Sequence, residues 1–184
     1  MKTDEIIIRQ TQCWLDKVII EKNICPFAKN ERNMNRIRFF VESANTFEEA
    51  LESLIRECEY LNNNADTETT LFILQQLGGD FNDYLDFLEI ATQLLLDQGF
   101  EGIFQLASFH PDYCFADSEP DDPANYTNRS PYPMLHIICE ESLEHALQNY
   151  SQPEQIPQRN IELCRKLGLT SMQKMLNECR KLKE

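Results

Sequence analysis

Residues 46–74, TFEEALESLIRECEYLNNNADTETTLFIL, decide the fold because they place a helix directly before a strand. Thr46 followed by Glu49 is a capping box, and apolar residues then recur at helical spacing as far as Leu61. Residues 69–74 form an uninterrupted apolar and β-branched run, which predicts a strand. The stretch therefore indicates an α/β protein.

The same alternation continues on both sides of this stretch. We expect further helices at about 7–22 and 82–97 and further strands at 37–41, 102–107 and 134–139. Short apolar strands separated by helices predict a sheet of about four strands, mainly parallel or mixed and flanked by helices, whose last pair can be antiparallel.

The C-terminal part of the chain is predicted to be helical. Ser151 to Glu154 and Thr170 to Gln173 are capping-box patterns, and Gly168 is a natural helix stop between them. We find no repeat or linker, so residues 1–184 are interpreted as a single α/β domain.

Composition limits the partners and the location of the protein. The 31 acidic and 17 basic residues give a net charge of −14, which repels nucleic acid and anionic membranes. The chain has no apolar segment of signal-peptide length or of the ~20 residues that span a bilayer. Seven cysteines without a CxxC pair predict free thiols in a reducing compartment. We therefore expect a soluble, cytoplasmic protein without a structural disulfide.

The most informative segment is the loop 108–133, SFHPDYCFADSEPDDPANYTNRSPYP. A connection this long without regular structure is unusual in a compact domain and is generally functional or disordered. Its aromatic residues supply anchors that a disordered linker lacks, and its five prolines restrict the backbone. The loop is therefore interpreted as a rigid site, with a purely structural loop as the alternative.

Two side chains of this loop carry chemistry. His110 follows a predicted strand and is a candidate general acid or base, unless it only ties the loop to a backbone carbonyl. Arg129 is a candidate clamp for a carboxylate or phosphate, unless it braces the loop through Asp121 or Asp122. Further substrate-binding candidates surround Arg129 or His110 in the loop: Asp112, Asn125, Tyr126 and Asn128.

Cys25 is the candidate nucleophile outside the loop. It follows the first predicted helix and precedes Pro26, where an exposed thiol can react if its pKa is lowered. A helix C-terminus raises a thiol pKa, which favours the alternative of a packed cysteine.

The acidic residues of the loop do not predict a metal site. Their spacing to His110 and His136 matches none of the known metal-binding patterns, so we assign no metal ligand and no cofactor. His136, on an alternating strand, is interpreted as a core or sheet-face residue.

Three segments resemble those of a domain-of-unknown-function family of bacterial proteins with plant relatives: CPFA at 25–28, SFHPDY at 108–113 and DDPANYTNRSPYPMLH at 121–136. The resemblance extends from about Trp14 to Leu167. It implies no established activity, cofactor or catalytic residue.

These observations lead to two functional hypotheses. The first is an enzyme that acts on a small anionic molecule, with Arg129 as the anchor, His110 as the proton carrier and Cys25 as a nucleophile. The second is a non-catalytic interaction module whose aromatic-rich loop docks a partner or a second copy of the chain. The first hypothesis requires the three side chains to converge at one edge of the sheet.

Overall fold

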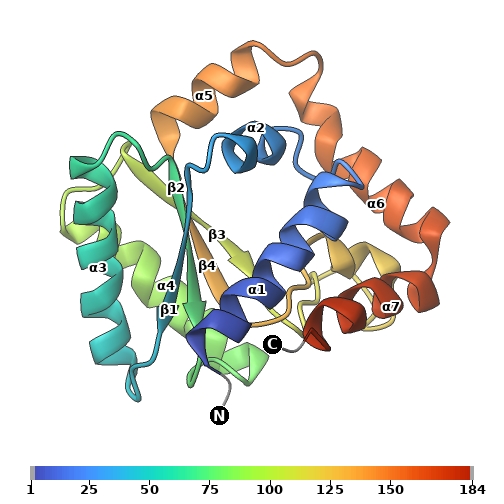
Figure 1. The fold of residues 1–184 in the computed structure, drawn as a ribbon, viewed down its shortest axis with the longest axis horizontal. Coiled ribbons are helices and arrows are strands. Elements are labelled where there is room, and N and C mark those ends of the chain that lie inside the picture. The colour runs from blue at the N-terminus through green and yellow to red at the C-terminus, as the bar shows by residue number, and fades with distance from the viewer. Residues whose placement is uncertain (1–2, 183–184) are drawn as a thin grey trace.

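The computed structural model describes residues 3–182, whose strands form one four-stranded sheet (Figure 1). The strands are β1 (Ile37–Glu42), β2 (Thr69–Leu74), β3 (Phe104–Phe109) and β4 (Met134–Cys139), in the spatial order β1-β2-β4-β3. β1 and β2 are parallel, whereas β4 is antiparallel to both β2 and β3. The expected α/β fold with a mixed sheet and a helical C-terminus is confirmed.

The connections explain the direction of each strand. α3 (Phe47–Asn63) crosses from β1 to β2, and α4 (Phe81–Asp97) crosses from β2 to β3, so these three strands run the same way. Between β3 and β4 the described chain contains only one 3-10 turn, η2 (Pro123–Thr127). The chain therefore re-enters the sheet at the same end of the strands at which β3 finished. β4 consequently runs antiparallel to β3.

Helices cover both faces of the sheet (Figure 1). α3 and α4 lie on one face. The other face carries the N-terminal and C-terminal helices: α1 (Asp4–Trp14), the π-helix η1 (Leu15–Ile20), α6 (Ile156–Leu167) and α7 (Leu169–Arg180). Three shorter helices complete the described chain: α2 (Ala28–Asn33), α5 (Glu140–Gln148) and the 3-10 turn η3 (Pro153–Gln155).

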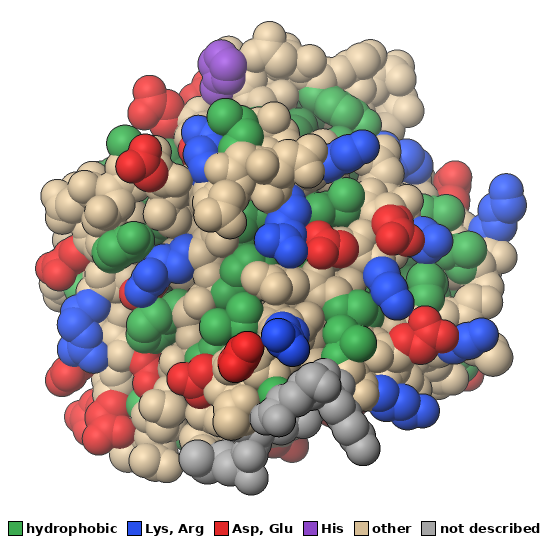
Figure 2. Space-filling model, in the orientation of Figure 1, with side chains coloured by type: hydrophobic (Ala, Val, Ile, Leu, Met, Phe, Trp, Pro, Cys, Tyr) green, Lys and Arg blue, Asp and Glu red, His purple; other side chains and the backbone are tan. Residues whose placement is uncertain are grey.

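Charged side chains of both signs are interspersed with apolar ones on the face that carries α1 (Figure 2). Within residues 3–182, none of the helices combines the length and the apolarity needed to cross a bilayer.

Strand alternation divides the core between the two faces. Leu71 and Ile73 of β2 belong to the cluster under α1 and α7, and Phe72 and Leu74 belong to the cluster under α3 and α4. All six residues of β2 are buried because helices cover the strand on both sides.

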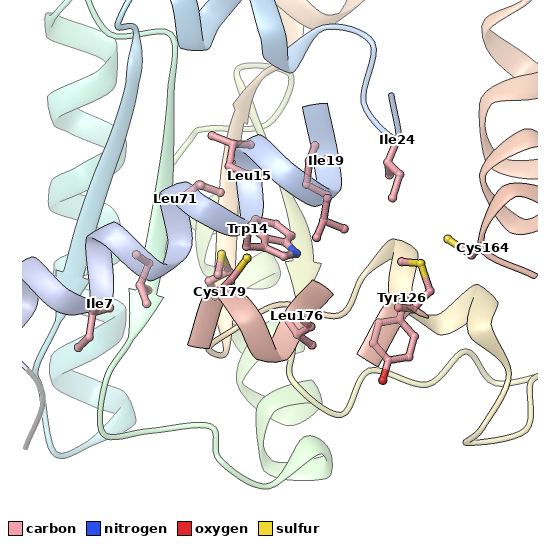
Figure 3. Packing of buried hydrophobic residues seen from close by; sticks show 14 residues of the cluster. Ile7, Trp14, Leu15, Ile19, Ile24, Leu71, Tyr126, Cys164, Leu176 and Cys179 are labelled. Carbon is pink, nitrogen blue, oxygen red and sulfur yellow. The ribbon is translucent and has the colours of Figure 1, made fainter. Parts of the chain in front are cut away.

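Trp14 connects the loop that follows β3 to the first cluster (Figure 3). Its side chain is only 1% exposed, and its ring meets the ring of Phe109 edge-on at a centroid distance of 5.2 Å. The indole N–H donates to the carbonyl of Arg129 at 2.9 Å. The end of α1 therefore holds both ends of the loop.

The local sequence signals have mixed outcomes. The cap at Thr46 is confirmed, because its hydroxyl accepts a hydrogen bond from the Glu49 amide at 3.3 Å. The first helix begins at Asp4, and its last part, Leu15–Ile20, is π-helical. β3 begins two residues later than expected, because Gly102 adopts a positive φ of 71° that belongs to a turn.

The two expected C-terminal caps are wrong. Pro153, two residues after Ser151, begins a 3-10 turn that leads directly into α6. α7 already begins at Leu169, so Thr170 lies inside the helix. The stop at Gly168 is confirmed by its φ of 82°, which residues with a side chain rarely adopt.

Candidate functional site

A cavity of about 280 Å³ lies between the sheet and the segments η1, α2 and α5. We call it the sheet cavity. Its floor consists of every second residue of the strands: Ile37, Thr69, Leu71, Ala107, Phe109, His136 and Ile138. Most of these side chains are apolar, so the polar ones determine what the cavity recognises.

His136 is the imidazole on the floor of the sheet cavity. In the strand register it lies opposite Leu71 of β2 and Ala107 of β3, and all three residues line the cavity. Its Nε2 is 2.6 Å from the Thr69 hydroxyl oxygen, and that hydroxyl donates to the carbonyl of Ile137 at 2.5 Å.

These two bonds determine the tautomer of His136. The Thr69 hydroxyl has one proton and uses it on the Ile137 carbonyl, so it accepts from the imidazole. Nε2 of His136 therefore carries the ring proton, and Nδ1 carries a lone pair. Among the described residues, no protein group hydrogen-bonds Nδ1. The floor of an apolar cavity thus presents one unused hydrogen-bond acceptor.

Burial keeps this acceptor available. Desolvation lowers the pKa of His136 to about 4, because a buried imidazolium loses its hydration. The ring is neutral at pH 7 and acts as a hydrogen-bond acceptor at Nδ1. It is too weak a base at that pH for efficient proton abstraction.

Cys25 lies on the wall of the same cavity, in the turn between η1 and α2. Burial raises the pKa of its thiol, and hydrogen bonds from the Phe27 and Ala28 amides offset part of this effect. The side chain is protonated at neutral pH. This environment supports the packed-cysteine interpretation more than the nucleophile.

Charge on the cavity wall is negative. Of the described residues that line the cavity, Glu31 and Glu68 carry charge, and no Lys or Arg is among them. Arg36 pairs with both carboxylates, at 2.7 Å and 3.4 Å. One guanidinium between two carboxylates leaves a net negative charge, which disfavours an anionic ligand.

A second cavity, of about 340 Å³, lies beside α6, and we call it the α6 cavity. Ile19, Cys25 and Phe109 line both cavities. The remaining residues around the α6 cavity come from the loop after β3, from α6 and from Ile24: Ile24, Phe115, Thr127, Asn128, Ile156, Pro157, Asn160 and Ile161.

His110 lies outside both cavities and is completely buried. Its Nδ1 accepts from the Asp112 amide at 3.0 Å, so its Nε2 carries the proton and donates to the Gly78 carbonyl at 2.8 Å. The ring packs against Phe81 and Tyr84 of α4, and desolvation lowers its pKa. Both nitrogens therefore tie the loop to the backbone, which is the alternative that the sequence left open.

Arg129 also lies outside both cavities and braces the loop from within. Its guanidinium donates to the carbonyls of Tyr113 at 3.0 Å and Pro120 at 2.8 Å, and it stacks 4.8 Å from the ring centroid of Tyr126. The expected bracing partner Asp122 instead pairs with Arg165 at 2.7 Å. The brace thus forms through carbonyls rather than carboxylates.

The other loop candidates have similar structural contacts. The Asn125 side chain is fully buried, accepting from the Phe115 amide and donating to the Glu119 carbonyl. Asn128 donates to the Ser108 carbonyl at 3.0 Å. Tyr126 is 5% exposed in the core, whereas Asp112 is exposed.

The structure does not place Cys25, His110 and Arg129 around one of the two cavities, as the first hypothesis requires. Cys25 and Asn128 both line the α6 cavity, but neither this cavity nor the sheet cavity is lined by His110 or Arg129. The sequence analysis assigned His136 to the sheet face and gave it no binding role. The available signal was the single histidine among the otherwise apolar or thiol-bearing residues 134–139.

No group of three or more His, Cys, Asp and Glu side chains within residues 3–182 has an arrangement that could hold a metal ion.

Comparisons with known proteins place the chain by family alone. Neither the curated proteins nor the solved structures provided a match. The model of one family matches residues 6–174, which is more than nine-tenths of the chain, and confirms the expected membership of an uncharacterised family. The chain belongs to the family described as "Protein of unknown function (DUF1415)".

Proposed function

We propose that the protein binds a small, neutral and mostly apolar molecule in the sheet cavity, where His136 accepts a hydrogen bond from the ligand. The observation that carries the proposal is the unused lone pair of His136 Nδ1 on an apolar floor. In an otherwise apolar cavity this acceptor fixes the orientation of a ligand that carries one O–H or N–H donor.

Charge supports a neutral ligand. The wall residues Glu31 and Glu68 repel an anion, and among the described lining residues there is no cation to hold one. The anionic substrate expected from the sequence remains a prediction. It has less support, because Arg129 uses its guanidinium on two loop carbonyls.

The protonation states support binding rather than covalent chemistry. His136 has too low a pKa to take a proton readily at pH 7, and Cys25 has a raised pKa and remains a thiol. An enzyme built on His110, Arg129 and Cys25 also remains a prediction. The contacts of His110 and Arg129 favour a structural role.

The interaction-module hypothesis rests on the loop aromatics. Tyr126 is buried, and Tyr113 and Tyr132 are half-buried, so these rings contribute less to the surface than docking to a partner or a second copy requires.

We propose a cytoplasmic location for the binding protein, which the free thiols of all seven cysteines support.

A matched pair of ligands tests the proposed function. p-Cresol and p-xylene differ by a hydroxyl in place of a methyl group, so only p-cresol can donate to His136. We expect calorimetry to show saturable binding of p-cresol. The preference for p-cresol over p-xylene should fall about five- to tenfold in His136→Leu, because leucine has no hydrogen-bond acceptor.

The control is His145→Gln, because His145 is an exposed histidine on α5. Its substitution should leave the preference for p-cresol unchanged. Absence of saturable binding of both compounds, or an equal preference in wild type and His136→Leu, would show that the proposed function is wrong.

A further inference from the structure

The sheet cavity and the α6 cavity meet at the same three side chains. Ile19, Cys25 and Phe109 line both. Cys25 is the smallest of the three, and its side chain is half-buried between η1 and α2. These side chains separate the two cavities, and Cys25, as the smallest, is the least obstacle to a ligand that extends from one cavity into the other.

The polar groups of the α6 cavity are satisfied by the protein itself. Thr127 donates to the Ala124 carbonyl at 2.9 Å, and the Asn128 amide donates to the Ser108 carbonyl at 3.0 Å. The Thr127 hydroxyl oxygen also lies 3.1 Å from Asn128 Oδ1, so its single proton is shared between the two acceptors.

Asn160 completes this pattern. It donates to the Ile24 carbonyl at 2.7 Å and accepts from Arg159 at 3.2 Å. The other residues around the α6 cavity are apolar or contribute a thiol. This cavity therefore offers apolar surface to a ligand and, among its described lining residues, no charged side chain.

The two cavities thus have different chemistry. The sheet cavity contains the unused acceptor of His136, and the α6 cavity contains only apolar surface and paired polar groups. A ligand that fits both cavities has a polar head, which donates to His136, and an apolar tail, which lies in the α6 cavity. The acidic wall disfavours an anionic head, and the mostly apolar lining disfavours any charged head, so the head is neutral.

We propose that the ligand is a neutral alkyl compound with a terminal hydrogen-bond donor, such as a medium- or long-chain primary alcohol. Its hydroxyl donates to Nδ1 of His136, and its chain passes Cys25 into the α6 cavity. This inference rests on the proposed function and adds the shape of the ligand and its orientation.

A chain-length series tests the inference. We measure the Kd values of 1-hexanol, 1-octanol and 1-decanol by calorimetry on the full chain. In wild type we expect each added methylene to tighten binding by about fourfold, because each one leaves water. Decanoate should bind more weakly than 1-decanol, because the cavity wall is acidic.

Ile161→Trp places a larger side chain in the α6 cavity only, because Ile161 does not line the sheet cavity. The Kd of 1-hexanol in this variant should stay within about twofold of the wild-type value. The increase in affinity from 1-hexanol to 1-decanol should be mostly lost. Ile90→Trp is the matched control, because Ile90 is 51% exposed on α4. This variant should retain the full gain.

The outcomes separate the two proposals. If 1-hexanol does not bind, or binds equally well to His136→Leu, the proposed function is wrong. If 1-hexanol binds through His136 but affinity stops rising with chain length, or Ile161→Trp retains the full gain, the elongated ligand is wrong. Equal or tighter binding of decanoate overturns the neutral head.

Discussion

His110 and His136 show how the partners of a buried imidazole determine its role. Both pKa values are lowered by desolvation, so both rings are neutral at pH 7. His110 uses both nitrogens on backbone groups of the protein. His136 uses one nitrogen on Thr69, lines the sheet cavity and has no protein partner at Nδ1 among the described residues. The contacts of His110 support a structural role, and those of His136 leave it as the candidate binding residue.

The pKa of His136 predicts a loss of stability in mild acid. The folded-state pKa of about 4 lies below the unfolded value of 6.5, so protons bind the unfolded chain first as the pH falls. The contribution of neutral His136 to the free energy of unfolding is complete above about pH 6.5 and is lost between about pH 6.5 and 4. Urea unfolding at pH 7 and 4.5 should show about 2.5 kcal/mol more destabilisation in wild type than in His136→Gln.

Exposed His145 provides the control for this measurement. His145→Gln should retain the wild-type loss of stability between pH 7 and 4.5. An identical loss in wild type and His136→Gln would contradict the low pKa of His136.

At the scale of elements, the first and last helices are joined more closely than their separation in sequence suggests. α1 packs against α7, and the side-chain amide of Gln10 donates to the carbonyls of Arg180 and Leu182 at the end of α7. Next to this contact, the sulfurs of Cys13 and Cys179 are 2.9 Å apart, and both residues are free thiols.

This proximity predicts a reversible crosslink between α1 and α7. With glutathione disulfide as oxidant, half-buried Cys13 attacks and releases one glutathione thiol; Cys179 then attacks the mixed disulfide and releases the second. The protein should lose about 2 Da, and its Tm should rise by about 5–15 °C, because the bond closes a long loop in the unfolded chain.

Cys58→Ser is the matched control for the crosslink, because Cys58 is fully buried in the other core cluster. This variant should still form the bond, whereas Cys13→Ser should not. A wild-type mass that does not change under oxidant would refute the crosslink.

At the scale of the whole molecule, the net charge of −14 is the dominant electrostatic property. Lys and Arg side chains lie among the acidic ones on the face that carries α1 (Figure 2), so local pairs offset part of the excess there. The uncompensated charge repels itself more in the compact state than in the expanded one.

Salt should therefore stabilise the protein. Raising NaCl from 20 to 200 mM shortens the screening length to below 10 Å and should raise the Tm by a few degrees in thermal unfolding. Because anions other than chloride act specifically on some proteins, sodium fluoride serves as the control salt and should have the same effect. A Tm that falls with salt would mean that attractive ion pairs outweigh the self-repulsion.

Local sequence determined the elements of this protein. The mostly apolar or β-branched runs at 69–74 and 134–139 predicted β2 and β4 with their observed bounds, and Thr46 predicted the start of α3. The resemblance of three segments to an uncharacterised family was also sufficient to predict the family. These features depend on neighbouring residues, so the sequence contains them directly.

Tertiary structure alone decided how the site is assembled. Insertion of β4 between β2 and β3 brought His136 next to Thr69, 67 residues earlier in the chain, and placed the ring on the floor of the sheet cavity. His110 and Arg129 found their partners among the carbonyls of Gly78, Tyr113 and Pro120. Every residue has a carbonyl, so side-chain patterns contain no signal for such bonds, and only the folded chain determines which carbonyl lies within reach.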